Sequence, residues 1–394
     1  MTEWKTYRLG DLCDTISDTY KGNAKSVVLI NTSDVLEGKC LNHTKEPNQN
    51  LKGQFKKTFK QYDIIYSEIR PANKRFAYID FDATDYIAST KLMVLRHNEK
   101  IEPLYLYYIL QSQGVIDELQ MLAESRSGTF PQITYSELSR LEVKLPNREI
   151  QKQILGILGA IDDKIENNRR INDNLEQQAQ ALFDNLMSNS NLEYKLIADI
   201  DHIIETGRRP KGGVANITSG VPSIGAENIK GLGKYDYSKT KYITAEFAET
   251  LKKGIIKGYE LLIYKDGGKP GYFIPNFSIF GEGFPYDNMT LNEHVFLLDF
   301  GNKGYNFFAY FYMQTEEVMK YLNAQGSKAA IPGINRNDVE GIAIPTIENE
   351  TVKEFCKRVE PIITAILTNA KESSRLATLR DTLLPKLMNG EIKI

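Results

Sequence analysis

Cysteine is scarce in this chain of 394 residues, and the three present (Cys13, Cys40 and Cys356) lie far apart. None forms the Cys-x-x-Cys spacing of a zinc or redox site, so the sequence indicates a reducing compartment without a zinc cluster. The four histidines are isolated and form no His-Glu-x-x-His motif. No apolar run approaches the roughly 18 residues of a membrane helix, and residues 1–5 have no apolar stretch typical of a signal peptide. We therefore expect a cytoplasmic protein that holds no metal.

Enzyme motifs are also missing. Residues 267–271 are too short for a phosphate-binding loop, and residues 231–233 lack the third glycine of a dinucleotide fingerprint. The Asn-Pro-Pro-Tyr/Phe motif of amino-methyltransferases does not occur. Residues 391–393 end like a nuclease motif but lack an upstream acidic residue in a strand context. We therefore expect that this chain catalyses nothing by itself and binds no cofactor.

The composition is that of an ordinary globular protein, with 41% hydrophobic and 25% charged residues. Its length predicts two or three domains. The net charge of −2, from 49 basic and 51 acidic residues, does not by itself suggest a nucleic-acid-binding protein. It does not exclude one either, because acidic surfaces can offset a basic face.

The most informative feature is an internal repeat with an offset near 200 residues. Residues 62–65 (Tyr-Asp-Ile-Ile) return as 259–262 (Tyr-Glu-Leu-Leu). Phe-Pro-Gln-Ile at 130–133 returns as Ile-Pro-Gly-Ile at 331–334. A repeat of this length is a whole domain, and a duplicated domain suits a partner with two similar halves.

Strand and helix patterns recur in the same order in both halves. Residues 1–147 predict a mixed domain, with strands at 27–30, 63–66 and 92–95 and a helix from Pro103 to about Leu122. Residues 191–348 repeat this plan. Its expected strands lie near Ile224, at 261–264 and at 295–298, followed by a helix from Tyr305 to Leu322.

Two long helices complete the chain, at 148–190 and 349–394. Apolar residues recur in steps of three and four over more than four heptads, which is typical of a coiled coil. If the helices pair along their length, connectivity makes them antiparallel and places the domains at opposite ends of a spacer of about 60 Å. Pro361 and Pro385 predict a kink or break in the second helix. The predicted fold is α+β, with two mixed α/β domains in tandem and an antiparallel coiled coil.

Asn168 and Asn369 lie 201 positions apart at matching seam positions of these helices. A buried polar residue at one seam position usually fixes helix register at some cost in stability. The alternative is that both asparagines are merely solvated.

Several stretches have the chemistry of DNA contacts. Residues 52–75 hold seven basic residues and only two acids, which suits phosphate oxygens. The loop 124–132 carries an arginine and a glutamine, which pair well with guanine and adenine. Counterparts occur in the second domain at 208–211, 265–269, 325–328 and 335–336. The alternative for each stretch is a solvated charged face, but recurrence in both halves favours binding.

From this local chemistry we predict the following DNA-binding residues. For bases these are Arg126 and Gln132 in the first domain and Lys328 and Arg336 in the second; for the phosphate backbone they are Arg70, Lys74 and Arg75 in the first domain and Arg209, Lys265 and Lys269 in the second.

The chain resembles the specificity (S) subunit of type I restriction–modification systems over essentially its whole length. The sharpest match is residues 378–392, with the sequence TLRDTLLPKLMNGEI, although Asn389 stands where serine is usual. A central region also matches, with EIQKQI at 149–154, IDDKIENNR at 161–169 and AQALF at 179–183. The opening WKTYRLGDL at 4–12 is typical as well.

The resemblance implies a division of labour. Residues 1–147 and 191–348 become target recognition domains, each recognising one part of a bipartite double-stranded DNA target. The helices 148–190 and 349–394 become a spacer that also docks two methyltransferase subunits, and restriction subunits join the complex. S-adenosylmethionine, ATP and Mg are expected on the partner subunits.

Two alternatives stay open. The chain could be a coiled-coil scaffold with two protein-interaction domains that never touch DNA. It could also be a nuclease or methyltransferase in its own right, which the missing motifs disfavour.

Overall fold

The computed structural model describes residues 4–49, 51, 53–125, 131–189, 191–267, 273–327 and 332–392. The chain divides into two compact units. Unit 1 comprises Met1–Asp162 and Thr378–Ile394, and unit 2 comprises Asp163–Ala377. The long helices α4 (Arg148–Asn189) and α9 (Glu350–Met388) each contribute a segment to both units.

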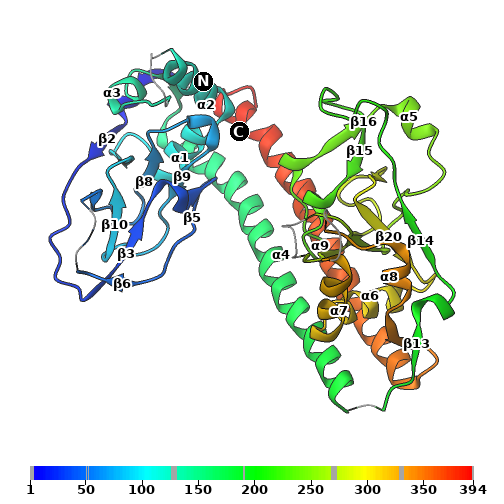
Figure 1. Ribbon diagram of the computed structural model, residues 1–394. Helices are drawn as coiled ribbons and strands as arrows, with labels where there is room; N and C mark the ends of the chain where they lie inside the picture. The colour runs from blue at the N-terminus through cyan, green and yellow to red at the C-terminus, as the bar shows by residue number, and fades with distance from the viewer. Residues whose placement is uncertain are drawn as a thin grey trace. The chain divides into compact units, whose positions relative to one another are not determined.

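Unit 1 is a mixed domain built on two four-stranded sheets (Figure 1). The first has the order β2-β11-β8-β9, with all neighbours antiparallel. The second has the order β6-β3-β10-β7, in which β3 and β10 are parallel. The strands are β1 (Lys5–Arg8), β2 (Cys13–Ile16), β3 (Ser26–Ile30), β4 (Val35–Leu36), β5 (Lys39–Cys40), β6 (Glu46–Pro47), β7 (Phe55–Lys57), β8 (Ile64–Ser67), β9 (Phe76–Tyr78), β10 (Tyr86–Ser89), β11 (Leu92–His97) and β12 (Glu142–Leu145). The fully buried β8 and the four buried residues that open β11 show why continuous apolar runs became the central strands.

The single helix expected after Pro103 is instead two helices, α1 (Pro103–Gln111) and α2 (Gln113–Glu124). Ser112 separates them because its backbone is extended, at φ −62° and ψ 140°. Its hydroxyl donates to the carbonyl of Ile109 (2.7 Å) and closes the end of α1. The short helix α3 (Tyr135–Leu138) follows.

Unit 2 repeats the architecture of unit 1. Its main sheet has the order β14-β20-β17-β18, again with antiparallel neighbours. The parallel pair β3–β10 has its counterpart in β15–β19, and the pair β1–β12 has its counterpart in β13–β21. The strands are β13 (Tyr194–Leu196), β14 (Ile203–Thr206), β15 (Val221–Ile224), β16 (Lys241–Ile243), β17 (Leu261–Tyr264), β18 (Phe277–Ile279), β19 (Thr290–Leu291), β20 (Val295–Asp299) and β21 (Ala343–Pro345). The tandem repeat predicted from the sequence is therefore confirmed.

The helices of unit 2 follow the same pattern. The expected helix 305–322 is again two helices, α6 (Lys303–Tyr312) and α7 (Glu316–Gly326), and α5 (Ala245–Glu249) and α8 (Arg336–Glu340) are short. The repeat extends to single backbone angles. Tyr62 and Tyr259, which precede β8 and β17, both have a left-handed backbone, with φ of 73° and 77°.

The two long helices pair in an antiparallel coiled coil, as the heptads predicted. In unit 2, Asn172 of α4 lies beside Asn369 of α9, and Asn168 lies beside Ser373. Residue numbers rise along α4 from 168 to 172 while the numbers of the paired residues in α9 fall from 373 to 369, so the two segments run in opposite directions. In unit 1, Arg380 Nη1 of α9 donates to Asp162 Oδ1 of α4 (2.8 Å), so the helices are in contact there as well.

Of the kink or break predicted at the two prolines, the break does not occur. Helix α9 is continuous from Glu350 to Met388, through both Pro361 and Pro385. Proline removes one backbone donor and so leaves the carbonyl four residues earlier unpaired. Both prolines are exposed, so water can satisfy these carbonyls and the helix continues.

Candidate nucleic-acid interface

Two segments far apart in the sequence meet in unit 1 at the end of β8. The N–H of Arg70 donates to the carbonyl of Pro131 (3.0 Å), and the N–H of Ile133 donates to Glu68 (2.8 Å). Ile69 and Gln132 thereby form an isolated antiparallel bridge. The N–H of Glu68 also donates to the carbonyl of Lys91 (3.0 Å). We call this meeting point the junction of unit 1.

Unit 2 builds the same junction with the same backbone hydrogen bonds. The N–H of Gly267 donates to Pro332 (2.9 Å), and the N–H of Ile334 donates to Lys265 (2.7 Å). Asp266 and Gly333 form the bridge, and the N–H of Lys265 donates to the carbonyl of His294 (3.1 Å). The two junctions are therefore equivalent in backbone, residue by residue.

The side chains at equivalent junction positions differ. Glu68, Ile69, Lys91 and Gln132 of unit 1 correspond to Lys265, Asp266, His294 and Gly333 of unit 2. Gly333 is required by close packing, because a Cβ there would lie 2.8 Å from the Cβ of Asp266. The two junctions therefore share one backbone frame and present different side-chain donors and acceptors.

Arg70 and Lys74 flank the 3₁₀ turn Pro71–Asn73 beside the junction of unit 1. Both have left-handed backbones, with φ of 47° and 52°, which non-glycine residues rarely adopt. The turn is held by the N–H of Ala72, which donates to Gln120 Oε1 (3.0 Å). Such strained residues cluster at binding sites. The structure thus brings two predicted DNA-binding residues, Arg70 and Gln132, to one place.

Arg75 lies in a different environment. Its Nη1 donates to the carbonyls of Ser33 (3.1 Å) and Val35 (3.3 Å), so the guanidinium links the residue before β9 to the start of β4. These hydrogen bonds favour a structural role over the phosphate contact expected from the sequence.

Three of the predicted residues, Arg126, Lys269 and Lys328, lie outside the residues that the structure describes. Arg336 opens α8 immediately after the junction of unit 2, and its Nε donates to Glu340 Oε1 (2.8 Å). That hydrogen bond holds the pKa of Glu340 below its usual value. The predicted base contact from Arg336 therefore competes with an ion pair on its own helix.

Arg209 and Lys265, both predicted to bind phosphate, are paired with acids in unit 2. The Nε of Arg209 donates to Glu293 Oε1 (2.5 Å), and its Nη2 also contacts His294. Lys265 Nζ lies 3.9 Å from Asp266 Oδ2 and 4.9 Å from the centre of the Phe296 ring. Sequence reasoning missed Glu293, His294 and Asp266; the one available signal was the charged pair Glu293-His294 directly before a strand.

The seam of the coiled coil is polar at its centre. Asn168 is buried, and its Nδ2 donates to Glu372 Oε2 (2.7 Å) and Ser373 Oγ (3.2 Å). Asn369 Nδ2 donates to Asn172 Oδ1 (2.9 Å). Both seam asparagines thus bond across to the partner helix, an arrangement suited to fixing register.

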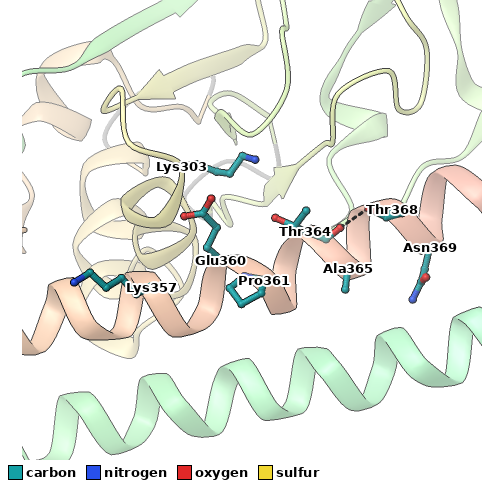
Figure 2. A pocket seen from close by; sticks show the side chains of 8 residues that line it. All are labelled: Lys303, Lys357, Glu360, Pro361, Thr364, Ala365, Thr368 and Asn369. Atoms are coloured by element: carbon teal, nitrogen blue, oxygen red, sulfur yellow. Dashed lines mark hydrogen bonds between the residues drawn. The ribbon is translucent and has the colours of Figure 1, made fainter.

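An open groove of about 700 Å³ runs along α9 in unit 2 (Figure 2). Its lining residues are Lys303, Lys357, Glu360, Pro361, Thr364, Ala365, Thr368 and Asn369. Figure 2 shows Asn369 pointing toward α4, where it bonds to Asn172, while Lys303 approaches from α6. The groove therefore ends at the polar seam. In the described ranges no group of three or more His, Cys, Asp or Glu side chains is placed to hold a metal ion, and no helix is long and apolar enough to span a membrane.

One family model and three known proteins that resemble this chain are described as specificity domains or subunits of type I restriction systems. A family model described as the type I restriction modification DNA specificity domain matches residues 1–177. The chain is 31% identical to the type I restriction enzyme HindI specificity subunit of Haemophilus influenzae, over 100% of both chains. It is 24% identical to the MjaIX specificity subunit of Methanocaldococcus jannaschii, over 74% of this chain and 69% of that one. The S subunit of a type I restriction–modification system from M. genitalium shares the fold, with a TM-score of 0.56 and 16% identity over 98% of this chain and 96% of that one.

Proposed function

Because the chain belongs to the family of type I restriction enzyme specificity subunits, we propose that its two junctions bind the two parts of a split double-stranded DNA site. The observation that carries this assignment is the equivalence of the junctions. Both are built by the same backbone hydrogen bonds, and each presents different side chains. A shared protein frame can hold different side chains in equivalent places, and side chains at base edges select the DNA sequence.

The paired helices supply the spacing. Residues 148–187 of the first helix carry seven acidic and five basic residues, so this surface is not suited to DNA phosphates. We assign it to the docking of two methyltransferase subunits, with restriction subunits joining the assembly. The seam asparagines would keep the helices in one register and so keep the gap between half-sites constant.

Catalysis belongs to the partners in this assignment. S-adenosylmethionine, ATP and Mg would bind the methyltransferase and restriction subunits, and this chain would supply the choice of sequence. A bacterial or archaeal cytoplasm, where the chromosome is accessible, is the expected location.

The test is to map N6-methyladenine across the genome of a strain with this subunit present and absent, in the presence of its methyltransferase subunits. The expected result is one split motif that is methylated only when the subunit is present. Methylation that does not depend on this chain would overturn the assignment. A reconstituted complex that shifts genomic fragments without sequence preference would favour the protein-interaction scaffold.

A further inference from the structure

Four side chains from three segments of unit 2 form a connected group beside its junction. They are Arg209, which follows β14, Glu293 and His294, which precede β20, and Asp266 of the junction. We call them the Arg209 cluster. Arg209 donates to Glu293 through Nε and Nη2, and Nη2 also contacts His294 Nε2. His294 Nδ1 in turn contacts Asp266 Oδ1.

The two hydrogen-bond partners of His294 determine which ring nitrogen accepts and which donates. A guanidinium has donors only, so Nε2 of His294 must accept from Arg209. The proton on Nδ1 is then donated to Asp266. Partial burial opposes ionisation of Glu293, but the hydrogen bond from Arg209 holds its pKa below the usual value. Arg209 is therefore held in place through Nε and Nη2, which contact Glu293 and His294.

The charges of this cluster and of the adjacent Lys265 do not suit phosphate. Arg209 and Lys265 are cationic, Glu293 and Asp266 are anionic, and Lys265 lies 3.9 Å from Asp266. The local net charge is close to zero, whereas phosphate binding draws on an excess of positive charge. In unit 1, by contrast, Arg70 and Lys74 form no ion pair with any described residue.

One end of Arg209 stays available. Its side chain is 28% exposed, and within the described ranges no protein group accepts a hydrogen bond from Nη1. A guanidinium held at a fixed angle by a carboxylate suits the recognition of a base, because base edges demand donors in defined positions. In the major groove guanine presents the acceptors O6 and N7, either of which can accept from Nη1, and it is the base that arginine most often contacts.

We propose that Arg209 recognises a guanine in the half-site bound by unit 2, with Glu293 and His294 as positioning residues. The inference rests on the proposed function and replaces the phosphate contact expected from the sequence. Unit 1 has Thr90 and Lys91 at the positions of Glu293 and His294, because Lys91 and His294 accept the equivalent backbone hydrogen bond. No carboxylate stands there to clamp an arginine, so the guanine contact is specific to one half-site.

The experiment uses the complex reconstituted with its methyltransferase subunits and a DNA library in which both half-sites are randomised. Methylated molecules are sequenced for the wild type, Arg209→Lys and Glu293→Gln. Arg209→Lys keeps the charge but loses the rigid guanidinium through which Glu293 and His294 hold the Nη1 donor in place. It should reduce discrimination for guanine at one position of one half-site by about tenfold or more. Glu293→Gln should relax the same position, and the other half-site should not change.

Arg208→Lys is the matched control, since Arg208 is the exposed neighbour of Arg209 and receives the same substitution. It should leave the motif intact, because the substitution keeps the positive charge of the stretch 208–211 and a phosphate contact carries no sequence information. Retention of full discrimination in both Arg209→Lys and Glu293→Gln would overturn the inference. So would a relaxed position that is not guanine, or uniform weakening with a smaller salt dependence, which marks a phosphate contact. If Arg209→Lys unfolds unit 2, the methylated molecules will show no sequence preference anywhere in that half-site. The result for Glu293→Gln then tests the inference. A wild-type complex without any motif would instead refute the proposed function.

Discussion

Arg96 grips the carboxylate of Asp63 with two hydrogen bonds, from Nε to Oδ1 (2.8 Å) and from Nη2 to Oδ2 (2.7 Å). Asp63 is only 1% exposed, and the pair joins β11 to the residue directly before its neighbour β8. Replacing Arg96 with leucine would leave a buried carboxylate without its cation. We expect the free energy of unfolding to fall by about 3–5 kcal/mol, measured by urea denaturation.

The exposed Arg140 of the same unit provides the control for Arg96. Arg140→Leu removes the same charge from the surface, and its effect should stay within about 0.5 kcal/mol. Equal effects of the two substitutions would contradict a stabilising role of the buried pair.

Glu260 occupies the position of Asp63 in unit 2, and both accept the backbone N–H three residues earlier, but among the described residues Glu260 has no arginine partner. Its carboxylate accepts the backbone N–H groups of Lys257 (2.9 Å) and Gly258 (2.8 Å). Burial, with a further contribution from repulsion by Asp299, raises the pKa of Glu260 above its usual value. The folded state therefore binds the Glu260 proton more tightly than the unfolded chain does.

This pKa shift predicts a direction for stability against pH. The contribution of Glu260 is fully present below the unfolded pKa of about 4.3 and is lost as pH rises through the folded value. The difference in unfolding free energy between the wild type and Glu260→Gln should therefore move against the wild type as pH rises. Urea denaturation at a series of pH values measures it, and a wild-type advantage that grows with pH would contradict the assignment.

The buried Asn168 is expected to fix the register of α4 against α9 at a cost in the free energy of unfolding. Its Oδ1 is buried and accepts no hydrogen bond from the described residues. Asn168→Leu removes this unsatisfied group, while Glu372 keeps its ion pair with Lys164 (3.2 Å). A gain of about 1 kcal/mol, which shifts the melting temperature by about 2–4 °C, is expected in thermal unfolding. A lower melting temperature would show that the hydrogen bonds to Glu372 and Ser373 outweigh the unsatisfied oxygen.

Much of the fold could be predicted because its signals are local. The apolar runs at 64–67 and 261–264 give the central strands, and heptad spacing gives the two long helices. The breaks at Ser112 and Thr315 were missed because a serine or threonine between apolar turns does not interrupt the helical pattern. Continuity through Pro361 depends on solvent exposure, which spacing alone does not reveal.

The site was less predictable because its groups come from distant segments. Arg209 and Glu293 are 84 positions apart and meet only because β14 pairs with β20. A basic residue in a sequence therefore does not reveal whether a carboxylate will neutralise it in the fold. The same limit applies to Arg75, whose hydrogen bonds to Ser33 and Val35 depend on how the chain before β4 folds back.

Lys74 and Arg75 are adjacent cations for which the structure predicts opposite consequences. Lys74 forms no ion pair with a described residue and flanks the turn beside the junction, whereas Arg75 bonds to two backbone carbonyls. Lys74→Ala should weaken binding to all DNA sequences and reduce the slope of log affinity against log salt by about 1. Its unfolding free energy should not change appreciably. Binding measured over a range of salt concentrations tests this.

Arg75→Ala is the comparison at the neighbouring residue, and it should change the unfolding free energy but not the salt dependence of DNA binding. Loss of its two charged hydrogen bonds should lower the unfolding free energy by about 1–2 kcal/mol, because the carbonyls of Ser33 and Val35 lose their donor. The salt slope of the folded complex should stay at the wild-type value, since no phosphate contact is removed. A reduced slope in Arg75→Ala, or an unchanged slope in Lys74→Ala, would exchange the roles assigned to the two residues.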